Sequence, residues 1–361
     1  MEKSVRIVAE FKVNCTQFLD VNGSLVQDLP DFLQDQKKII EFYCAMAELR
    51  EFDAIAIALQ RTGKIGTYPS TLGQEAISIG IGAAMEPEDI FCPYYRDCGA
   101  QFWRGVKMSE ILLYWGGDER GSNFSGNKQD FPLCVPVASQ VLHAVGVANA
   151  IKLKKESKVV VTVVGDGGTS RGDFYEAINL AGVWQLPVVF VINNNQWAIS
   201  VPRSEQTMAT TLAQKGIAAG IDNEQVDGND VIAVCYSIRK AVEKARNRQG
   251  PTLIEALSYR LSDHTTADDA KRYRNIEELQ KQRLADPLLR LHQYLISKHL
   301  WNEKEEVELK NKVTNKVESA VEEYLNINSE NALAMFDYLY AKLPAALASQ
   351  REECLRLFGE S

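Results

Sequence analysis

The sequence predicts an α/β fold in which a mostly parallel sheet is flanked by helices. Two apolar runs, 159–164 and 186–192, are rich in Val and Ile and polar on neither face, as in the strands of a buried parallel sheet. A helical stretch of about a dozen residues separates them, which suits a right-handed parallel crossover. A further strand is expected at 252–257, after Gln249-Gly250-Pro251. Ligands of such a sheet bind at the carboxyl ends of its strands.

The other elements follow from turn signals and periodicity. Asn22-Gly23 and Leu29-Pro30-Asp31 are turn signals, so the first residues are expected to form an extended arm. Residues 116–136 carry Gly, Asn and Pro and are expected to be a loop. Apolar or small side chains at helical spacing predict helices in further stretches: 35–61, from 74 onward, and 138–155.

We expect one α/β domain with an extension at each end. The N-terminal arm would be 1–34, the domain 35–275, and a helical C-terminal extension 276–361, packed on that domain. The extension is charged and carries a leucine stripe that includes Leu288 and Leu291. It is expected to serve packing and assembly rather than to hold a site.

Composition limits the classes of function. The chain has 361 residues, with 40 Lys and Arg against 48 Asp and Glu, a formal net charge of −8. A general nucleic-acid-binding protein needs a basic footprint, so that class is disfavoured. Seven cysteines without metal-like pairing fit reduced thiols in a cytoplasm. The sequence carries no secretory pattern and no apolar run of about 20 residues, so neither export nor a membrane span is expected.

Two polar side chains follow neighbouring strands of the predicted sheet. Asp166 comes directly after the first apolar run, and Asn195 ends the second. Neighbouring strands lie about 4.8 Å apart and Mg²⁺ takes oxygen ligands at about 2.1 Å, so one ion can be held from both strand ends. Gly167 and Gly168 leave backbone N–H groups open to phosphate oxygens, and the next helix directs its positive end to the same place. The spacing predicts a site for a metal and a diphosphate.

Simpler explanations exist for parts of this pattern. A Gly-Asp-Gly after a strand is usually only a tight turn with a capping carboxylate. The dinucleotide-binding fingerprint is excluded because it requires glycine where Ser170 stands, and the P-loop lysine and hydroxyl pair is missing. Asn193-Asn194-Asn195-Gln196, however, is a poor continuation of a buried strand, which favours a functional role for its end.

The beginning and the end of this unit, Gly165-Asp166-Gly167 and Asn194-Asn195, resemble the thiamine diphosphate motif. Residues 174–181 and 196–200 are similar to the alpha subunit of the decarboxylating first component of 2-oxo acid dehydrogenase complexes, most of all the bacterial pyruvate type. The resemblance extends over residues 35–345. It implies the thiamine diphosphate-binding fold, with thiamine diphosphate and Mg²⁺ as cofactors.

The resemblance also implies roles for individual residues. Mg²⁺ would be held by Asp166, Asn195 and the backbone carbonyl of Trp197. The cofactor would be contacted by a set drawn from several segments: Tyr95, Arg96, Val135, Val137, Asp166, Gly167, Gly168, Asn195, Trp197 and His264. Val137 would be the apolar wedge that bends the cofactor, and Val135 stands where relatives often carry Gly or Ser.

Two of these residues have ordinary explanations when taken alone. Arg96 offers donors that suit phosphate oxygens, but a surface Arg paired with Asp97 is the simpler reading. His264 lies in a polar loop after a strand and can move protons near neutral pH, although a lone loop histidine is more often solvated. The resemblance places both beside the cofactor. It makes His264 the expected catalytic residue, assisting proton handling or stabilising the lipoyl-transfer step.

The implied function is oxidative decarboxylation of a 2-oxo acid, with pyruvate as the expected substrate. The acyl group would pass to the lipoyl group of an acyltransferase component, while thiamine diphosphate acts as the electron sink. The glutamate that activates the cofactor is not identified in this chain, and in two-chain relatives it comes from a beta subunit. An α₂β₂ heterotetramer in a bacterial cytoplasm is therefore expected, and an isolated chain should be inactive.

Alternative functions remain open. Pro69 stands where animal pyruvate-specific relatives have a histidine, and segment 63–69 is more like bacterial two-chain and branched-chain enzymes. A branched-chain 2-oxo acid or acetoin dehydrogenase alpha subunit is therefore the alternative, and side chains near Tyr68 and Phe91 would discriminate. Tyr68 either faces the substrate or packs in the core. From another class, the chain would be a non-catalytic assembly subunit, which the joint presence of the metal, phosphate and histidine residues argues against.

The other histidines are expected to be structural. His143 lies in an apolar helical stretch, which predicts a core residue. His292 and His299 lack a third ligand nearby, so a metal site there is not expected.

Overall fold

The computed structural model describes residues 6–337 and 339–358. At its centre is a six-stranded sheet in the order β1-β7-β8-β4-β3-β2, and all neighbouring strands run parallel. The strands are β1 Cys15–Thr16, β2 Ile90–Cys92, β3 Val160–Gly165, β4 Val188–Asn194, β7 Asp222–Asp227 and β8 Thr252–Leu257. A separate antiparallel hairpin pairs β5 (Trp197–Ala198) with β6 (Val201–Pro202). The predicted α/β fold is confirmed.

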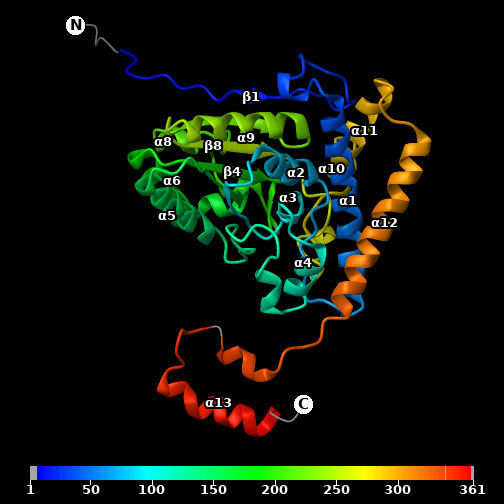
Figure 1. The fold of residues 1–361 in the computed structure, drawn as a ribbon. Coiled ribbons are helices and arrows are strands. Elements are labelled where there is room, and N and C mark those ends of the chain that lie inside the picture. The colour runs from blue at the N-terminus through cyan, green and yellow to red at the C-terminus, as the bar shows by residue number, and fades with distance from the viewer. Residues whose placement is uncertain (1–5, 338, 359–361) are drawn as a thin grey trace. The chain divides into compact units, whose positions relative to one another are not determined.

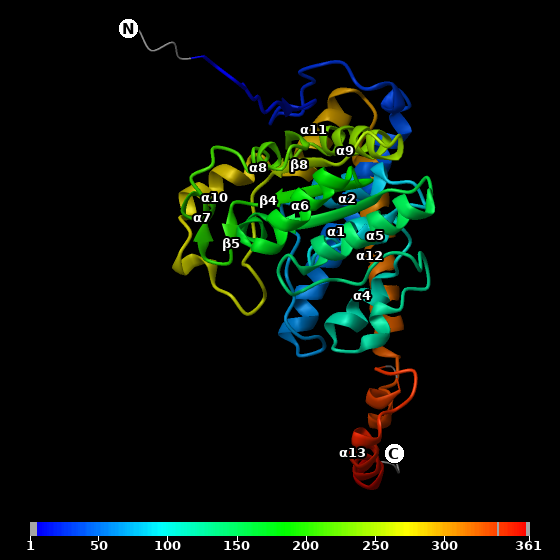
Figure 2. The ribbon, with the colours of Figure 1, turned by 90° about the vertical axis from the view of Figure 1, so that its left-hand side faces the viewer.

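Helices flank the sheet on both sides (Figure 1). On one side, α5 (Ser139–Lys154) and α6 (Gly172–Trp184) share an apolar cluster with β3 and β4, and Figure 2 shows both helices in front of the strands. On the other side, α2 (Glu75–Ala84) packs tightly against α9 (Val231–Arg246). Gly80 permits this approach, because a Cβ there would lie 2.6 Å from Cγ1 of Val234. The strands are therefore apolar on both faces, as the sequence predicted.

The remaining helices lie around this core and towards the C-terminus. They are α1 Gln36–Arg61, α3 Cys98–Trp103, α4 Met108–Trp115, α7 Arg203–Gln206, α8 Lys215–Ala218, α10 Ile276–Arg283, α11 Pro287–Ser297, α12 Glu303–Leu325 and α13 Ala345–Phe358. By internal contacts the chain forms two units, one ending at Val321 and the other beginning at Glu322. The second unit contains a 3-10 turn at Ala332–Phe336 and α13. The domain boundaries proposed after residues 34 and 275 stay predictions.

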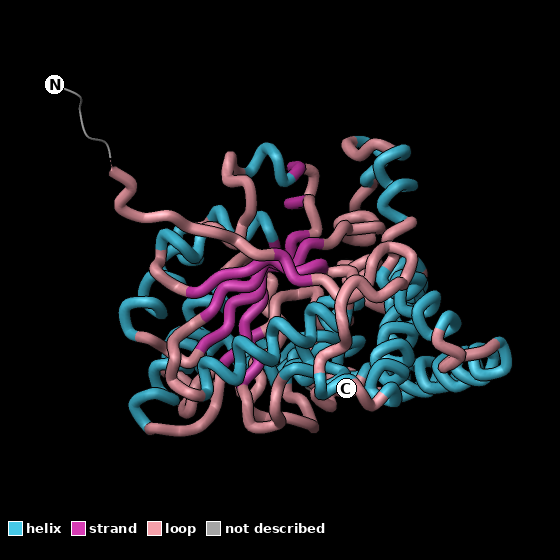
Figure 3. The backbone as a smooth tube through the Cα atoms, turned by 90° about the horizontal axis from the view of Figure 1, so that it is seen from above, coloured by secondary structure: helices cyan, strands magenta, loops and turns pink. Residues whose placement is uncertain are grey.

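Asp230 fastens the N-terminal arm to the sheet. Figure 3 shows the arm running to the strands, where β1 pairs with β7. The fully buried Asp230 caps α9, since its carboxylate accepts the N–H groups of Ile232 and Ala233 at 3.0 and 3.2 Å. It also accepts the N–H groups of Phe18 and Leu19, both at 2.7 Å. Burial raises the pKa of this carboxyl to about 6. One side chain thus begins a helix and holds the arm.

One histidine prediction is wrong. His143 is exposed on α5 and stacks on Phe131 with ring centroids 6.2 Å apart, because the buried face of this helix is the one that carries Val141 and Ala144. His292 lies 3.9 Å from a carboxylate oxygen of Glu306. Across residues 6–337 and 339–358, we find no helix with the length and apolarity that a membrane span requires.

Candidate active site

The carboxyl ends of β3 and β4 bring the two halves of the motif together. Gly165 is paired in register with Asn193, so Asp166 and Asn195 emerge at the same edge of the sheet. Both side chains are buried, with exposed fractions of 2% and 4%. They line a cavity of about 230 Å³ at this edge. The predicted convergence of carboxylate and amide is therefore present.

Most of the predicted site residues line this cavity. They are Tyr95, Arg96, Val137, Asp166, Gly167, Gly168, Asn195, Trp197 and His264. Val135 is not brought into the lining, and its side chain is 47% exposed. Because the lining residues come from well-separated stretches of chain, the fold and not one motif assembles the cavity.

Asp166 is a buried carboxylate without a cationic partner. Its Oδ2 accepts a hydrogen bond from Nε2 of Gln206 at 2.8 Å. No Lys, Arg or His among the described residues forms an ion pair with it. Burial raises the pKa of this carboxyl above its ordinary value. A carboxylate in this position is suited to binding a cation, which would offset the cost of burying its charge.

Arg96 is the opposite case, a buried guanidinium without a carboxylate. It is 2% exposed and donates to the carbonyl oxygens of Ser70 and His264, both at 2.5 Å. Asp97 does not pair with it, since Oδ2 of Asp97 accepts the backbone N–H of Tyr94. The simple surface ion pair considered from the sequence is therefore wrong. The guanidinium is placed to receive an anion from the cavity.

Asn195 offers an amide oxygen beside this carboxylate. Its Nδ2 donates to Oε1 of Gln74 at 2.8 Å, and its Oδ1 accepts the N–H of Trp197 at 3.2 Å. The ring of Trp197 packs against Tyr273. In the described part of the chain, no cluster of three His, Cys, Asp or Glu side chains could hold a metal. The candidate set is instead one carboxylate, one amide oxygen and a backbone carbonyl, which are donors that suit Mg²⁺.

The two glycines of the motif have no room for a side chain. A Cβ on Gly167 would lie 2.5 Å from Cβ of Ala198, and a Cβ on Gly168 would lie 2.4 Å from Cγ2 of Val164. Gly172, at the start of α6, has open space at the same position. Close approach of the backbone is therefore required only where the cavity is lined, as expected for a phosphate cradle.

His264 is held neutral by its surroundings. Its Nδ1 lies 3.0 Å from Nη2 of Arg96 and 3.3 Å from Nη1 of Arg260. Burial and then these two positive charges lower the pKa of the imidazole to about 3. The backbone N–H of His264 donates to Asp268 at 2.8 Å, and Arg260 donates to the carbonyl of Ile199 at 2.8 Å. The histidine loop is thus tied to the segment after β5.

The comparisons with known proteins address the whole chain. The family model described as dehydrogenase E1 component matches residues 43–330. The chain belongs to this family. It is 39% identical over 344 residues to the pyruvate dehydrogenase E1 component subunit alpha of Staphylococcus aureus (strain Mu50 / ATCC 700699), a match that covers 94% of this chain and 92% of that protein. The protein of the same name from Staphylococcus epidermidis (strain ATCC 12228 / FDA PCI 1200) is 38% identical with the same coverage. The resemblance drawn from the motif is confirmed.

In this E1 component, three residues beside the cavity were missed by sequence reasoning. Gln74 contacts Asn195 across 121 positions of sequence, and Gln206 contacts Asp166 across 40. Neither glutamine stands in a pattern that marks such a contact. Arg260 precedes His264 by four positions in the same loop, so a cation near a candidate histidine was a usable signal.

Tyr68 and Phe91 do not face this cavity. Tyr68 is 1% exposed, and its hydroxyl donates to Oδ1 of Asp53 at 3.1 Å. Phe91 is fully buried in β2. Of the two positions considered for Tyr68, the structure shows the core.

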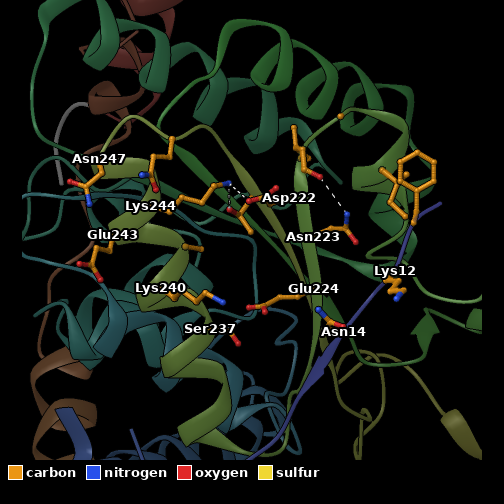
Figure 4. A pocket seen from close by; sticks show the side chains of 17 residues that line it. Lys12, Asn14, Asp222, Asn223, Glu224, Ser237, Lys240, Glu243, Lys244 and Asn247 are labelled. Atoms are coloured by element: carbon orange, nitrogen blue, oxygen red, sulfur yellow. Dashed lines mark hydrogen bonds and ion pairs between the residues drawn. The ribbon is translucent and has the colours of Figure 1, made fainter. Parts of the chain in front are cut away.

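The largest hollow lies away from this edge. A groove of about 790 Å³ runs between the N-terminal arm, the amino ends of β7 and β8, and α9 (Figure 4). Its charges balance, with lysines and carboxylates in equal number: Lys12, Lys240, Lys244, Asp222, Glu224 and Glu243. Lys244 pairs with Asp222 at 2.8 Å. All six charged side chains are at least partly exposed, so the groove has no buried charge that needs a ligand.

Proposed function

We propose that the chain is the alpha subunit of a two-chain enzyme that decarboxylates a 2-oxo acid oxidatively, using thiamine diphosphate and Mg²⁺. One observation carries this proposal. The cavity at the carboxyl edge of the sheet has a buried carboxylate without a cation, Asp166, and a buried guanidinium without an anion, Arg96. A diphosphate with its Mg²⁺ ion supplies both missing partners.

The cavity residues divide between metal and diphosphate. The proposed Mg²⁺ ligands are Asp166, Asn195 and the backbone carbonyl of Trp197. The proposed diphosphate contacts are the N–H groups of Gly167 and Gly168 with the side chains of Tyr95 and Arg96. Val137, 48% exposed at the cavity, offers the apolar contact that would bend the cofactor. The contact from Val135 stays a prediction, since its side chain lies outside the lining.

His264 is proposed to act as a hydrogen-bond donor rather than a base. Bound thiamine diphosphate supplies the electron sink for decarboxylation. Guanidinium groups only donate, so Nδ1 of His264 accepts from Arg96 and the proton of the neutral ring lies on Nε2. An Nε2–H group at the cavity can stabilise negative charge on a substrate or lipoyl intermediate. This is the second of the two roles expected from the sequence.

The activating carboxylate is proposed to come from another subunit. Asp166 is the one Asp or Glu among the described residues lining the cavity, and Gln206 already binds it. A beta subunit in an α₂β₂ heterotetramer would supply the missing glutamate. A lipoyl-bearing acyltransferase component would then accept the acyl group. The relatives named as a subunit alpha support this division.

Pyruvate is the proposed substrate because the similar proteins are named as pyruvate dehydrogenase components. A branched-chain 2-oxo acid is the alternative, which Pro69 and its neighbours keep open. A bacterial cytoplasm is the proposed location. All seven cysteines are free thiols, as a reducing compartment favours.

The substrate test uses the chain co-expressed with its partner subunit. The ratio of kcat/KM for pyruvate to that for 3-methyl-2-oxobutanoate is measured with an artificial electron acceptor. We expect pyruvate to be preferred by about tenfold or more. A preference for the branched acid would favour the alternative enzyme. Failure to bind thiamine diphosphate at all would favour a non-catalytic assembly subunit.

A further inference from the structure

Gln74 connects the first turn of α2 to the end of β4. It is 1% exposed, and its Oε1 accepts the Nδ2–H of Asn195 at 2.8 Å. The segment around it is closely fitted, since a Cβ on the preceding Gly73 would lie 2.5 Å from the carbonyl oxygen of Tyr259. The backbone N–H of Gln74 also donates to the carbonyl of Thr71 at 2.9 Å. The acceptor is therefore held in a fixed place.

An asparagine side chain has two ends of similar shape and opposite hydrogen-bonding character. A metal ion accepts the oxygen and rejects the NH₂ group, so the orientation of the amide decides whether Asn195 can be a ligand. Because Gln74 accepts from Nδ2, Oδ1 is the end left at the cavity edge. Oδ1 accepts one hydrogen bond, from Trp197, and has a second lone pair.

We propose that Gln74 is a positioning residue that selects the oxygen end of Asn195 for Mg²⁺. Because Mg²⁺ binding at this edge belongs to the proposed function, the role of Gln74 rests on that function. Residues that orient a metal ligand from behind change metal affinity about 10- to 100-fold when they are removed. The role requires only an acceptor at this position.

The other half of the Gln74 amide makes the test sharp. Its Nε2 has no hydrogen-bond partner among the described residues. Gln74→Glu therefore keeps the acceptor and removes no donor that is in use. Gln74→Met keeps the length and apolar stem but removes the acceptor. Gln101 supplies a matched control, because it is fully buried on α3 and neither of its side-chain polar atoms has a partner in the described chain.

The measurement is calorimetric titration of MgCl₂ into each variant, co-purified with its partner subunit and saturated with thiamine diphosphate. We expect Gln74→Met to raise the Kd for Mg²⁺ about 10- to 100-fold. Gln74→Glu should stay within about threefold of the wild type or bind more tightly, and Gln101→Met should match the wild type. Wild-type affinity in Gln74→Met, or equal losses in Gln74→Met and Gln74→Glu, would overturn the proposal.

A double-mutant cycle gives a second measurement if Gln74→Met lowers the thermal stability. Aspartate at position 195 has two equivalent oxygens, so its orientation needs no selection. Asn195→Asp should therefore remove most of the effect of Gln74→Met on Mg²⁺ affinity. Simple additivity of the two changes would overturn the proposal. If the wild-type complex took up no Mg²⁺ with thiamine diphosphate, the proposed function itself would fall, and the role of Gln74 with it.

Discussion

Nη2 of Arg96 lies 3.0 Å from Nδ1 of His264, and the same guanidinium donates to the carbonyl oxygen of His264 at 2.5 Å. This pair joins the segment after β2 to the loop after β8. It fixes the tautomer of the histidine, since a guanidinium has no lone pair to offer. It also keeps the imidazole uncharged where an anionic cofactor is expected to bind.

Replacing Arg96 by Gln should raise the pKa of His264 part of the way from about 3 towards its ordinary value, because burial still disfavours the charged ring. The unfolded chain binds this proton near pH 6.5, before the folded chain does. The contribution of His264 to the unfolding free energy is therefore lost as the pH falls from about 6.5 towards 3. Nuclear magnetic resonance of ¹³C-labelled histidine measures the shift, with exposed His143 as internal reference. Titration of His264 near pH 6.5 in the wild type would contradict the account.

Gly167→Ala should weaken cofactor binding at least about tenfold, because the new Cβ would displace Ala198 and the adjacent Trp197 carbonyl. Gly172→Ala is the matched control, since nothing lies within 4 Å of the Cβ position there. Fluorescence titration with thiamine diphosphate compares the two variants in the complex with the partner. Equal binding by both variants would argue against a close backbone cradle at Gly167.

Asp166→Ala should abolish Mg²⁺-dependent binding of thiamine diphosphate, since it removes the one charged ligand proposed for the metal. Asp173→Ala, seven positions later in the first turn of α6, removes an equal charge outside the cavity and should bind normally. Calorimetry with and without MgCl₂ provides the readout. Unchanged binding by Asp166→Ala would remove the metal assignment.

Asp230→Ala should destabilise the chain by about 3 kcal/mol or more, because it leaves four backbone N–H groups without their acceptor. Asn275→Ala removes an exposed cap from α10 and should cost about 1 kcal/mol. Urea unfolding compares the two. Similar small losses in both variants would mean that Asp230 does not hold the N-terminal arm.

The parts of the fold that could be predicted are those buried on both faces. β3, β4 and β8 consist mainly of Val, Ile and Leu, and their length and apolarity identify them. β7, Asp222–Asp227, is mostly polar and was not predicted, because it lies beside the short edge strand β1 and is only partly buried. Its strand character comes from pairing with β8 rather than from its own residues.

The site could be predicted as far as its residues follow strands. Asp166 and Asn195 stand one crossover apart, so the parallel sheet brings them together whatever the rest of the chain does. The partners that orient them, Gln206 and Gln74, come from elements whose place depends on the whole fold. Val135 was assigned through resemblance alone, and the lining of the cavity does not include it.

The most direct test is the rate of oxidative decarboxylation of pyruvate by the chain alone, by the partner subunit alone and by both together, with thiamine diphosphate, Mg²⁺ and an artificial electron acceptor. The account predicts turnover only in the mixture, and none when the chain carries Asp166→Ala. Robust turnover by the isolated chain would contradict the central claim that it supplies only half of the site.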